Sequence, residues 1–120
     1  MLIRPRGRIF VAAEATDLRK SYDGLAALVA GEFGQDVFEG DLFVFRNRRG
    51  NQVRVLYWDR DGYAIWMKRL EAGTFRRVRS EEGKSIVEVD LARLTMLLEG
   101  VDAKVVTKRK RYARPIPAVA

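Results

Sequence analysis

Residues 42–75 read LFVFRNRRGNQVRVLYWDRDGYAIWMKRLEAGTF, and this stretch predicts more of the fold than any other. β-branched and aromatic residues dominate three of its runs, and such residues favour β-strands. Asp61-Gly62 is a signal for a two-residue hairpin turn, because such turns require positive φ angles. The stretch therefore predicts an antiparallel ribbon made of a strand, a basic tip, a strand, the Asp-Gly turn, a strand, a short Gly turn and a further strand.

Shorter elements are predicted on both sides of this ribbon. Residues 9–12 form an apolar run that predicts a first strand. A helical apolar stripe predicts a helix over residues 17–32 with Thr16 as its N-cap; its members are Leu18, Tyr22, Leu25, Ala26, Val29 and Phe33. Residues 86–89 predict another short strand. Asp90 is then expected to cap a second helix, whose apolar face consists of Leu91, Leu94, Leu97 and Leu98.

These elements predict a single domain of the α+β class. A chain of 120 residues has the length of one domain. We expect an antiparallel sheet of about five or six strands packed with two helices, over residues 1–102. Residues 103–120 contain two prolines and show no apolar period, which predicts a basic, flexible tail.

The composition excludes several kinds of site. The chain has no cysteine and no histidine, which excludes disulfides, zinc–thiolate centres, cysteine nucleophiles and a histidine general base. Asp59 and Asp61 are more simply interpreted as turn residues than as metal ligands. We therefore expect no catalytic residue, no metal and no cofactor. The sequence lacks an apolar run of membrane-spanning length and a signal peptide, which predicts a cytoplasmic protein that has no contact with membranes and associates with the nucleoid when bound to DNA.

Positive charge is concentrated toward the end of the chain. The formal net charge is +7, and residues 103–120 contain six cations and no acid. A basic tail on a nearly neutral domain is typical of nucleic-acid binding. We expect four tail residues to contact nucleic acid: Lys108, Arg109, Lys110 and Arg111. The alternative is a tail that only increases solubility.

The predicted ribbon carries a second group of candidate phosphate ligands. Arg46, Arg48 and Arg49 lie at its first tip, and guanidinium groups bind phosphate through several donors. Arg76, Arg77 and Arg79 form a weaker candidate cluster with Lys68 and Arg69, because neighbours in a strand point to opposite faces and only some of these residues can share a surface. Residues 16–20 could add Arg19 and Lys20 to the same surface. The alternative for the tip arginines is a solvated polar loop, and for residues 16–20 it is that Thr16 caps the helix without any ligand.

Both faces of the predicted ribbon are apolar. Alternation places Leu56, Trp58, Ile65 and Met67 on one face and Val53, Val55, Tyr57 and Trp66 on the other. Two helices can cover one face, so the second must be covered by more of this chain, by a second copy or by another protein. We therefore expect Tyr57 and Trp66 to form a partner interface, filled by a homodimer or by another protein. The alternative is that all of these residues are ordinary core.

The amino-acid sequence of the ribbon and of its flanking segments also resembles that of a known family. LFVFRNRRGN, YWDRDGY and KRLEAGTF, with TDLRK and DGLAALV upstream and LTMLLEGVD downstream, resemble the small accessory protein of the insertion-sequence-66 family of bacterial transposable elements. The accessory protein of that family is the product of the element's second open reading frame and is often called TnpB. The RNA-guided nuclease that shares the name TnpB is a different and much larger protein.

The resemblance implies a role but no catalytic residues. Elements of this kind encode a separate, large DDE-type transposase that performs the strand chemistry, and the small protein resembles a factor needed for efficient transposition. We therefore expect a non-enzymatic accessory factor that binds DNA, the transposase, or both, through the basic tip and the tail. The alternative is a protein–protein adaptor of the transposase that never contacts DNA.

Overall fold

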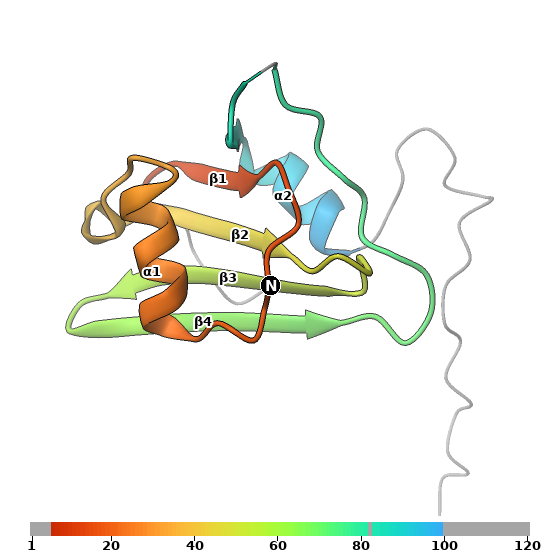
Figure 1. Ribbon diagram of the computed structural model, residues 1–120, viewed down its shortest axis with the longest axis horizontal. Coiled ribbons are helices and arrows are strands. Elements are labelled where there is room, and N and C mark those ends of the chain that lie inside the picture. The colour runs from red at the N-terminus through yellow and green to blue at the C-terminus, as the bar shows by residue number, and fades with distance from the viewer. Residues whose placement is uncertain (1–5, 82, 100–120) are drawn as a thin grey trace, which may run out of the picture.

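The computed structural model describes residues 6–81 and 83–99 (Figure 1). The predicted tail of residues 103–120 lies outside the described residues, as do Lys108, Arg109, Lys110 and Arg111. The elements, in chain order, are β1 (Ile9–Ala12), α1 (Tyr22–Gly31), the short 3-10 helix η1 (Val37–Glu39), β2 (Leu42–Arg46), β3 (Gln52–Asp59), β4 (Gly62–Arg69), β5 (Ile86–Val89) and α2 (Leu91–Leu98).

The five strands form one sheet in the order β4-β3-β2-β1-β5. This confirms the predicted α+β fold with five strands and two helices. The expectation of a purely antiparallel sheet is wrong at one position, because β1 and β2 pair in parallel. Between β1 and β2 the chain passes through α1, and a crossover of this length returns the next strand in the same direction. All other neighbouring strands are antiparallel.

The two helices lie on opposite faces of the sheet (Figure 1). Under α1, Leu25 and Val29 pack with Phe43, Phe45 and other residues of that face. On the other face, α2 packs against the alternate residues of the strands, which are Ile9, Val11, Leu42, Val44, Val53 and Val55. The expectation that both helices cover one face is therefore wrong, since each face has a helix of its own.

A segment after β4 adds further cover to the α2 face. Phe75 is buried there, and Leu70 and Val78 pack beside it. Tyr57 and Trp66 belong to the same layer, where both side chains are half-buried. A partner interface at these two residues stays a prediction, and it no longer has support from an uncovered sheet face.

The β3–β4 hairpin has the predicted faces but a different register. Asp59 pairs with Gly62, so the two turn residues are Arg60 and Asp61, and Arg60 has a φ of 55°. The predicted turn at Asp61-Gly62 is therefore wrong by one residue, and the pairing of β3 with β4 is shifted by two residues. A slip of two residues leaves every side chain on its face. The observed register places Trp58 opposite Tyr63, with ring centroids 5.1 Å apart, and the indole Nε1 donates to the Arg60 carbonyl oxygen at 3.0 Å.

The start of α1 is later than predicted. The backbone N–H of Thr16 donates to the Arg46 carbonyl oxygen at 2.8 Å, which ties residue 16 to the end of β2, and residues 17–21 after it are not helical. The N-cap is Ser21 instead, and its side chain makes no capping hydrogen bond. The further strand predicted after the Gly turn is absent from the described part of the chain, where residues 74–80 are irregular.

The start of α2 agrees with the prediction and gives a direct test. The Asp90 carboxylate accepts a hydrogen bond from the Arg93 backbone N–H at 2.7 Å. We expect Asp90→Ala to lower the free energy of unfolding by about 1 kcal/mol, because an N-cap oxygen satisfies an otherwise unpaired helix donor. Urea denaturation measures the loss. Asp90→Asn is the matched control, since asparagine caps equally well, and equal stability of all three proteins would contradict the assignment.

Candidate nucleic-acid interface

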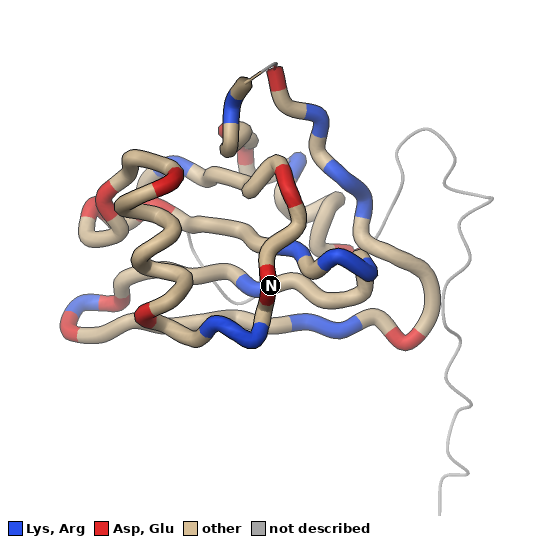
Figure 2. The backbone as a smooth tube through the Cα atoms, viewed as in Figure 1, with Lys and Arg blue, Asp and Glu red and all other residues tan. Residues whose placement is uncertain are grey.

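One end of the sheet collects most of the candidate arginines (Figure 2). Strands β1, β2 and β4 finish at this end, and β3 and β5 begin there. The topology therefore gathers three connections, over residues 13–21, 47–51 and 70–85. We call this region the basic end and define it by Arg19, Arg46, Arg48, Arg49, Arg76 and Arg77.

The β2–β3 tip is held in one conformation by its asparagines. Asn47 accepts hydrogen bonds from the backbone N–H of Gly50 at its carbonyl oxygen, 3.0 Å, and from that of Gln52 at its Oδ1, 3.0 Å. Its Nδ2 donates to Asn51 Oδ1 at 2.8 Å. Gly50 has a φ of 76°, which L-residues with a Cβ rarely adopt.

The segment that follows β4 braces this tip. The backbone N–H of Leu70 donates to the Asn51 carbonyl oxygen at 2.8 Å, and that of Phe75 donates to the Gly50 carbonyl oxygen at 2.7 Å. Burial of the Phe75 side chain anchors the segment in the core beneath α2. Arg48 and Arg49 are therefore exposed side chains on a turn whose backbone is already fixed. Such a turn loses less conformational entropy when its side chains bind a phosphate.

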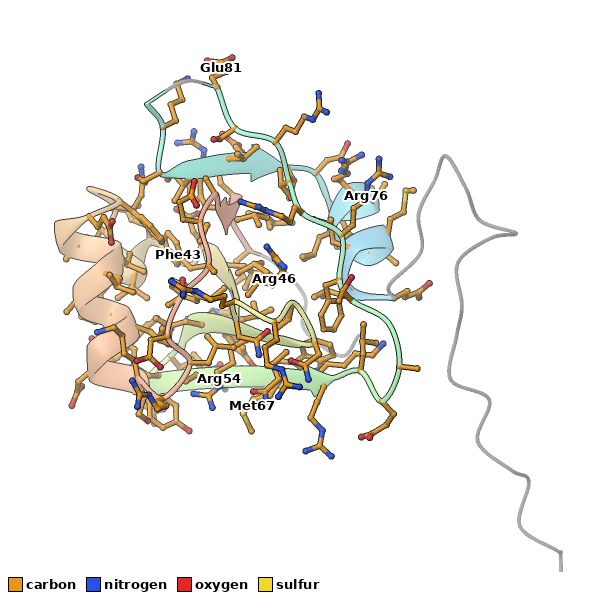
Figure 3. The ribbon with its side chains drawn as sticks, turned by 45° about the vertical axis from the view of Figure 1, so that its right-hand side comes forward. Phe43, Arg46, Arg54, Met67, Arg76 and Glu81 are labelled. Atoms are coloured by element: carbon orange, nitrogen blue, oxygen red, sulfur yellow. The ribbon has the colours of Figure 1, made fainter. Side chains whose placement is uncertain are left out.

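Arg46, which is labelled in Figure 3, lies in a different environment from the exposed Arg48 and Arg49. It is half-buried on the α2 face opposite Val53, and its Nη1 lies against Gly50. Burial, and after it the positive charge of Arg77, lower the pKa of the Arg46 guanidinium. Within residues 6–81 and 83–99, Arg46 forms no ion pair with a carboxylate. Burial and a second positive charge both disfavour the charged form of this guanidinium, so a bound anion would stabilise it.

Arg19 reaches the tip from the loop after β1. A pocket of about 570 Å³ lies between residues 15–19 and residues 47–49. Arg19 Nη2 lies 2.8 Å from Asp17 Oδ2, and the hydrogen bonds between the two side chains lower the pKa of Asp17 to about 2. The pair is intact at neutral pH and is lost only as the pH falls toward 2. The net positive charge of the pocket therefore comes from Arg48 and Arg49.

Arg76 and Arg77 lie on the bracing segment. Together with Arg79 they line an open groove of about 730 Å³ beside β5 and the start of α2, and Figure 3 shows Arg76 next to α2. Arg77 Nη2 is 3.7 Å from Glu14 Oε2 in an exposed pair. Arg93 of α2 completes the groove. Sequence reasoning missed Arg93, because its helical pattern identified only the apolar face of α2.

Carboxylates limit how far this surface extends. Glu88 and Asp90 also line the groove, and Glu88 is paired with Arg8 at 2.5 Å. Lys68 has a structural contact, because its Nζ donates a hydrogen bond to the Leu98 carbonyl oxygen at 3.0 Å. This contact places its positive charge at the negative end of the α2 dipole. Of the arginines that define the basic end, Arg48 and Arg49 are exposed and form no ion pair within the described residues.

Gly50 provides a test of the tip's geometry. A Cβ built at this position would lie 2.6 Å from Arg46 Nη1 and 3.3 Å from Thr74 Cβ. We expect Gly50→Ala to lower the free energy of unfolding by about 1–2 kcal/mol, because alanine disfavours positive φ. Thermal or urea unfolding checks this value. Gly31→Ala is the control: a Cβ there meets nothing within 4 Å, so it should not destabilise the fold, and equal losses would be the contrary result.

The described residues show neither a metal centre nor a membrane span. Among residues 6–81 and 83–99, no group of three or more Asp or Glu side chains is arranged to hold a metal ion. No helix in that part of the chain is both long and apolar enough to cross a bilayer.

The fold and this end of the sheet define a small α+β module with an arginine-rich tip, and comparison with known proteins specifies its family. Residues 7–108 match the model of the IS66 Orf2-like proteins. The chain is 36% identical over 108 residues to uncharacterized protein y4jC of Sinorhizobium fredii (strain NBRC 101917 / NGR234), covering 90% of each chain. It is 34% identical over 95 residues to uncharacterized protein y4hO of the same strain, covering 79% of this chain and 81% of the relative. No solved structure matches the chain.

The chain therefore belongs to the family of IS66 Orf2-like proteins. Membership implies an accessory role associated with the transposition of an insertion sequence, which agrees with the resemblance noted in the sequence.

Proposed function

We propose that this protein is a non-enzymatic accessory factor of transposition that binds the DNA backbone through the basic end. The observation that carries the proposal is the convergence of arginines from three separate connections, with Arg48 and Arg49 exposed on a braced turn and Arg46 lacking a carboxylate partner within the described residues. Guanidinium groups donate several hydrogen bonds to phosphate oxygens. Such contacts position a protein on DNA without distinguishing the base sequence. Family membership supports the transposition context.

The transposase of the same element is the expected protein partner, and an adaptor that contacts only the transposase is the alternative function. The two differ in one measurable property. Each phosphate contact releases counterions, so the affinity of a DNA-binding factor falls steeply with salt. Fluorescence anisotropy of the full chain with a short labelled duplex, from about 50 to 300 mM salt, tests this. Salt-dependent binding supports the proposal, whereas no binding at the lowest salt concentration would favour the adaptor.

The tail provides a separate prediction. Deleting residues 103–120 removes six cations and no acid. The apolar clusters formed by the described residues extend no further than Leu98, so we expect the fold to be retained. Duplex binding should weaken, and the log–log salt slope should fall by about 0.9 for each phosphate that the tail neutralises in the full chain. An unchanged slope in the deleted protein would show that the tail binds no phosphate.

A further inference from the structure

A cluster of three aromatic rings lies at the end of the sheet opposite the basic end. Phe38 of η1 meets Trp58 of β3 edge to face, with ring centroids 4.7 Å apart, and lies 6.3 Å from Tyr63 of β4. Trp58 and Tyr63 are half-buried, whereas Phe38 is 58% exposed. The cluster sits on the α1 face, at the β3–β4 turn.

Local structure presents Phe38 to solvent instead of burying it. Asp36 is the N-cap of η1, and its carboxylate accepts a hydrogen bond from the Phe38 backbone N–H at 2.9 Å. Val37, the neighbouring residue, takes the buried position in the core. A single exposed apolar residue is ordinary, but an exposed ring in contact with two further aromatic rings forms a ready platform for a ligand.

Acidic residues lie in the two segments that carry these rings, at η1 and at the β3–β4 turn, and Figure 2 shows both segments at the same end of the sheet. All four side chains concerned are exposed: Asp36, Glu39, Asp59 and Asp61. Within the described residues none of the four forms an ion pair. Arg60 lies in the same turn, and Arg6 lies beside Gly40 at the end of η1, so the four acids outnumber these two cations. We call the three rings and four carboxylates the aromatic–acidic patch.

We propose that the aromatic–acidic patch is a docking surface for an extended, arginine- and lysine-rich segment of a protein partner. Charge complementarity selects this occupant: guanidinium and ammonium groups bind over aromatic faces, and neighbouring carboxylates add ion pairs at the rim. The same carboxylates repel phosphate, which separates this surface from the proposed DNA contact. The protein would then hold DNA at one end of its sheet and a basic protein segment at the other.

The test uses the full chain and a synthetic peptide made of Arg-Gly repeats. Backbone amide shifts in ¹⁵N NMR should move at residues 36–39 and 58–63 on titration. Phe38→Ser should weaken binding by about two- to fivefold, the range expected for one exposed cation–π contact. Asp59→Asn with Asp61→Asn should weaken it further, and asparagine is tolerated in turns.

A charge-matched variant separates docking from general attraction to an acidic surface. Glu32→Gln with Glu71→Gln removes two negative charges away from the patch and should leave the affinity close to that of the wild type. Equal losses in the two double variants, amide shifts outside the patch, or no binding of the peptide would each overturn the proposal. Equal binding of a Leu-Ser repeat peptide would also overturn it, since this would indicate an apolar partner. None of these results depends on DNA binding.

Discussion

Phe43→Ala is expected to lower the free energy of unfolding by about 3–5 kcal/mol, the usual cost of deleting a buried phenyl ring. The Phe43 side chain is fully buried in the central strand β2, and its ring stacks on Phe10 with centroids 5.6 Å apart. Leu25 and Val29 of α1 belong to the same apolar cluster. Because a domain of this size has only about 5–15 kcal/mol of stability, urea denaturation should show a large shift of the midpoint.

Phe38→Ala is the matched control for this prediction. The same ring is removed from a side chain that is 58% exposed and contacts Trp58 and Tyr63. Its loss should cost no more than about 1 kcal/mol, since exposed substitutions and single aromatic pairs each contribute little. Similar losses in the two variants would show that the core beneath α1 is not packed as described.

Arg48→Ala combined with Arg49→Ala is expected to weaken duplex binding by roughly 30-fold at about 0.15 M salt, because each phosphate contact contributes about fivefold there through counterion release. Both side chains are exposed, so the stability of the fold should change little. In cells carrying the complete element, the frequency of transposition should fall toward that of an element lacking this gene. If the double variant keeps the wild-type affinity for DNA and the wild-type frequency of transposition, the tip is an ordinary solvated loop.

The two faces of the ribbon can be predicted from the sequence because alternation alone determines them. Val55 and Trp66 lie on the predicted face, and Leu56 and Ile65 lie on the other. The error in turn position does not affect this, since the slip is of two residues. The register itself depends on tertiary contacts of Trp58 with Phe38 and Tyr63, and the local Asp-Gly signal does not include them.

The parallel pairing of β1 with β2 has a signal in the sequence. The predicted helix lies between the first strand and the ribbon, and such a connection is typical of a parallel crossover. The crossover carries α1 onto one face of the sheet, and α2 packs on the other face after β5. Because α2 covers the second face of the sheet, Tyr57 and Trp66 do not lie on an uncovered face.

The candidate site is predictable in composition but not in detail. The sequence identifies the arginines of the tip, and the structure leaves Arg48 and Arg49 exposed there. The half-buried position of Arg46 depends on the bracing segment, whose docking through Phe75 has no local sequence signal. The pairing of Arg19 with Asp17 likewise depends on the geometry of the loop after β1.

If the basic end contacts DNA phosphates, removing its exposed arginines must reduce the salt dependence of duplex binding. The slope of log K against log salt concentration would be measured for the wild type, for the Arg48→Ala/Arg49→Ala variant and for Arg6→Ala/Arg60→Ala, which removes the same charge from the opposite end of the sheet. The slope of the tip variant should be smaller by about 1.8, since each phosphate contact contributes about 0.9, while the control should keep the wild-type slope. Identical slopes for all three proteins, or equal reductions in both variants, would contradict this contact.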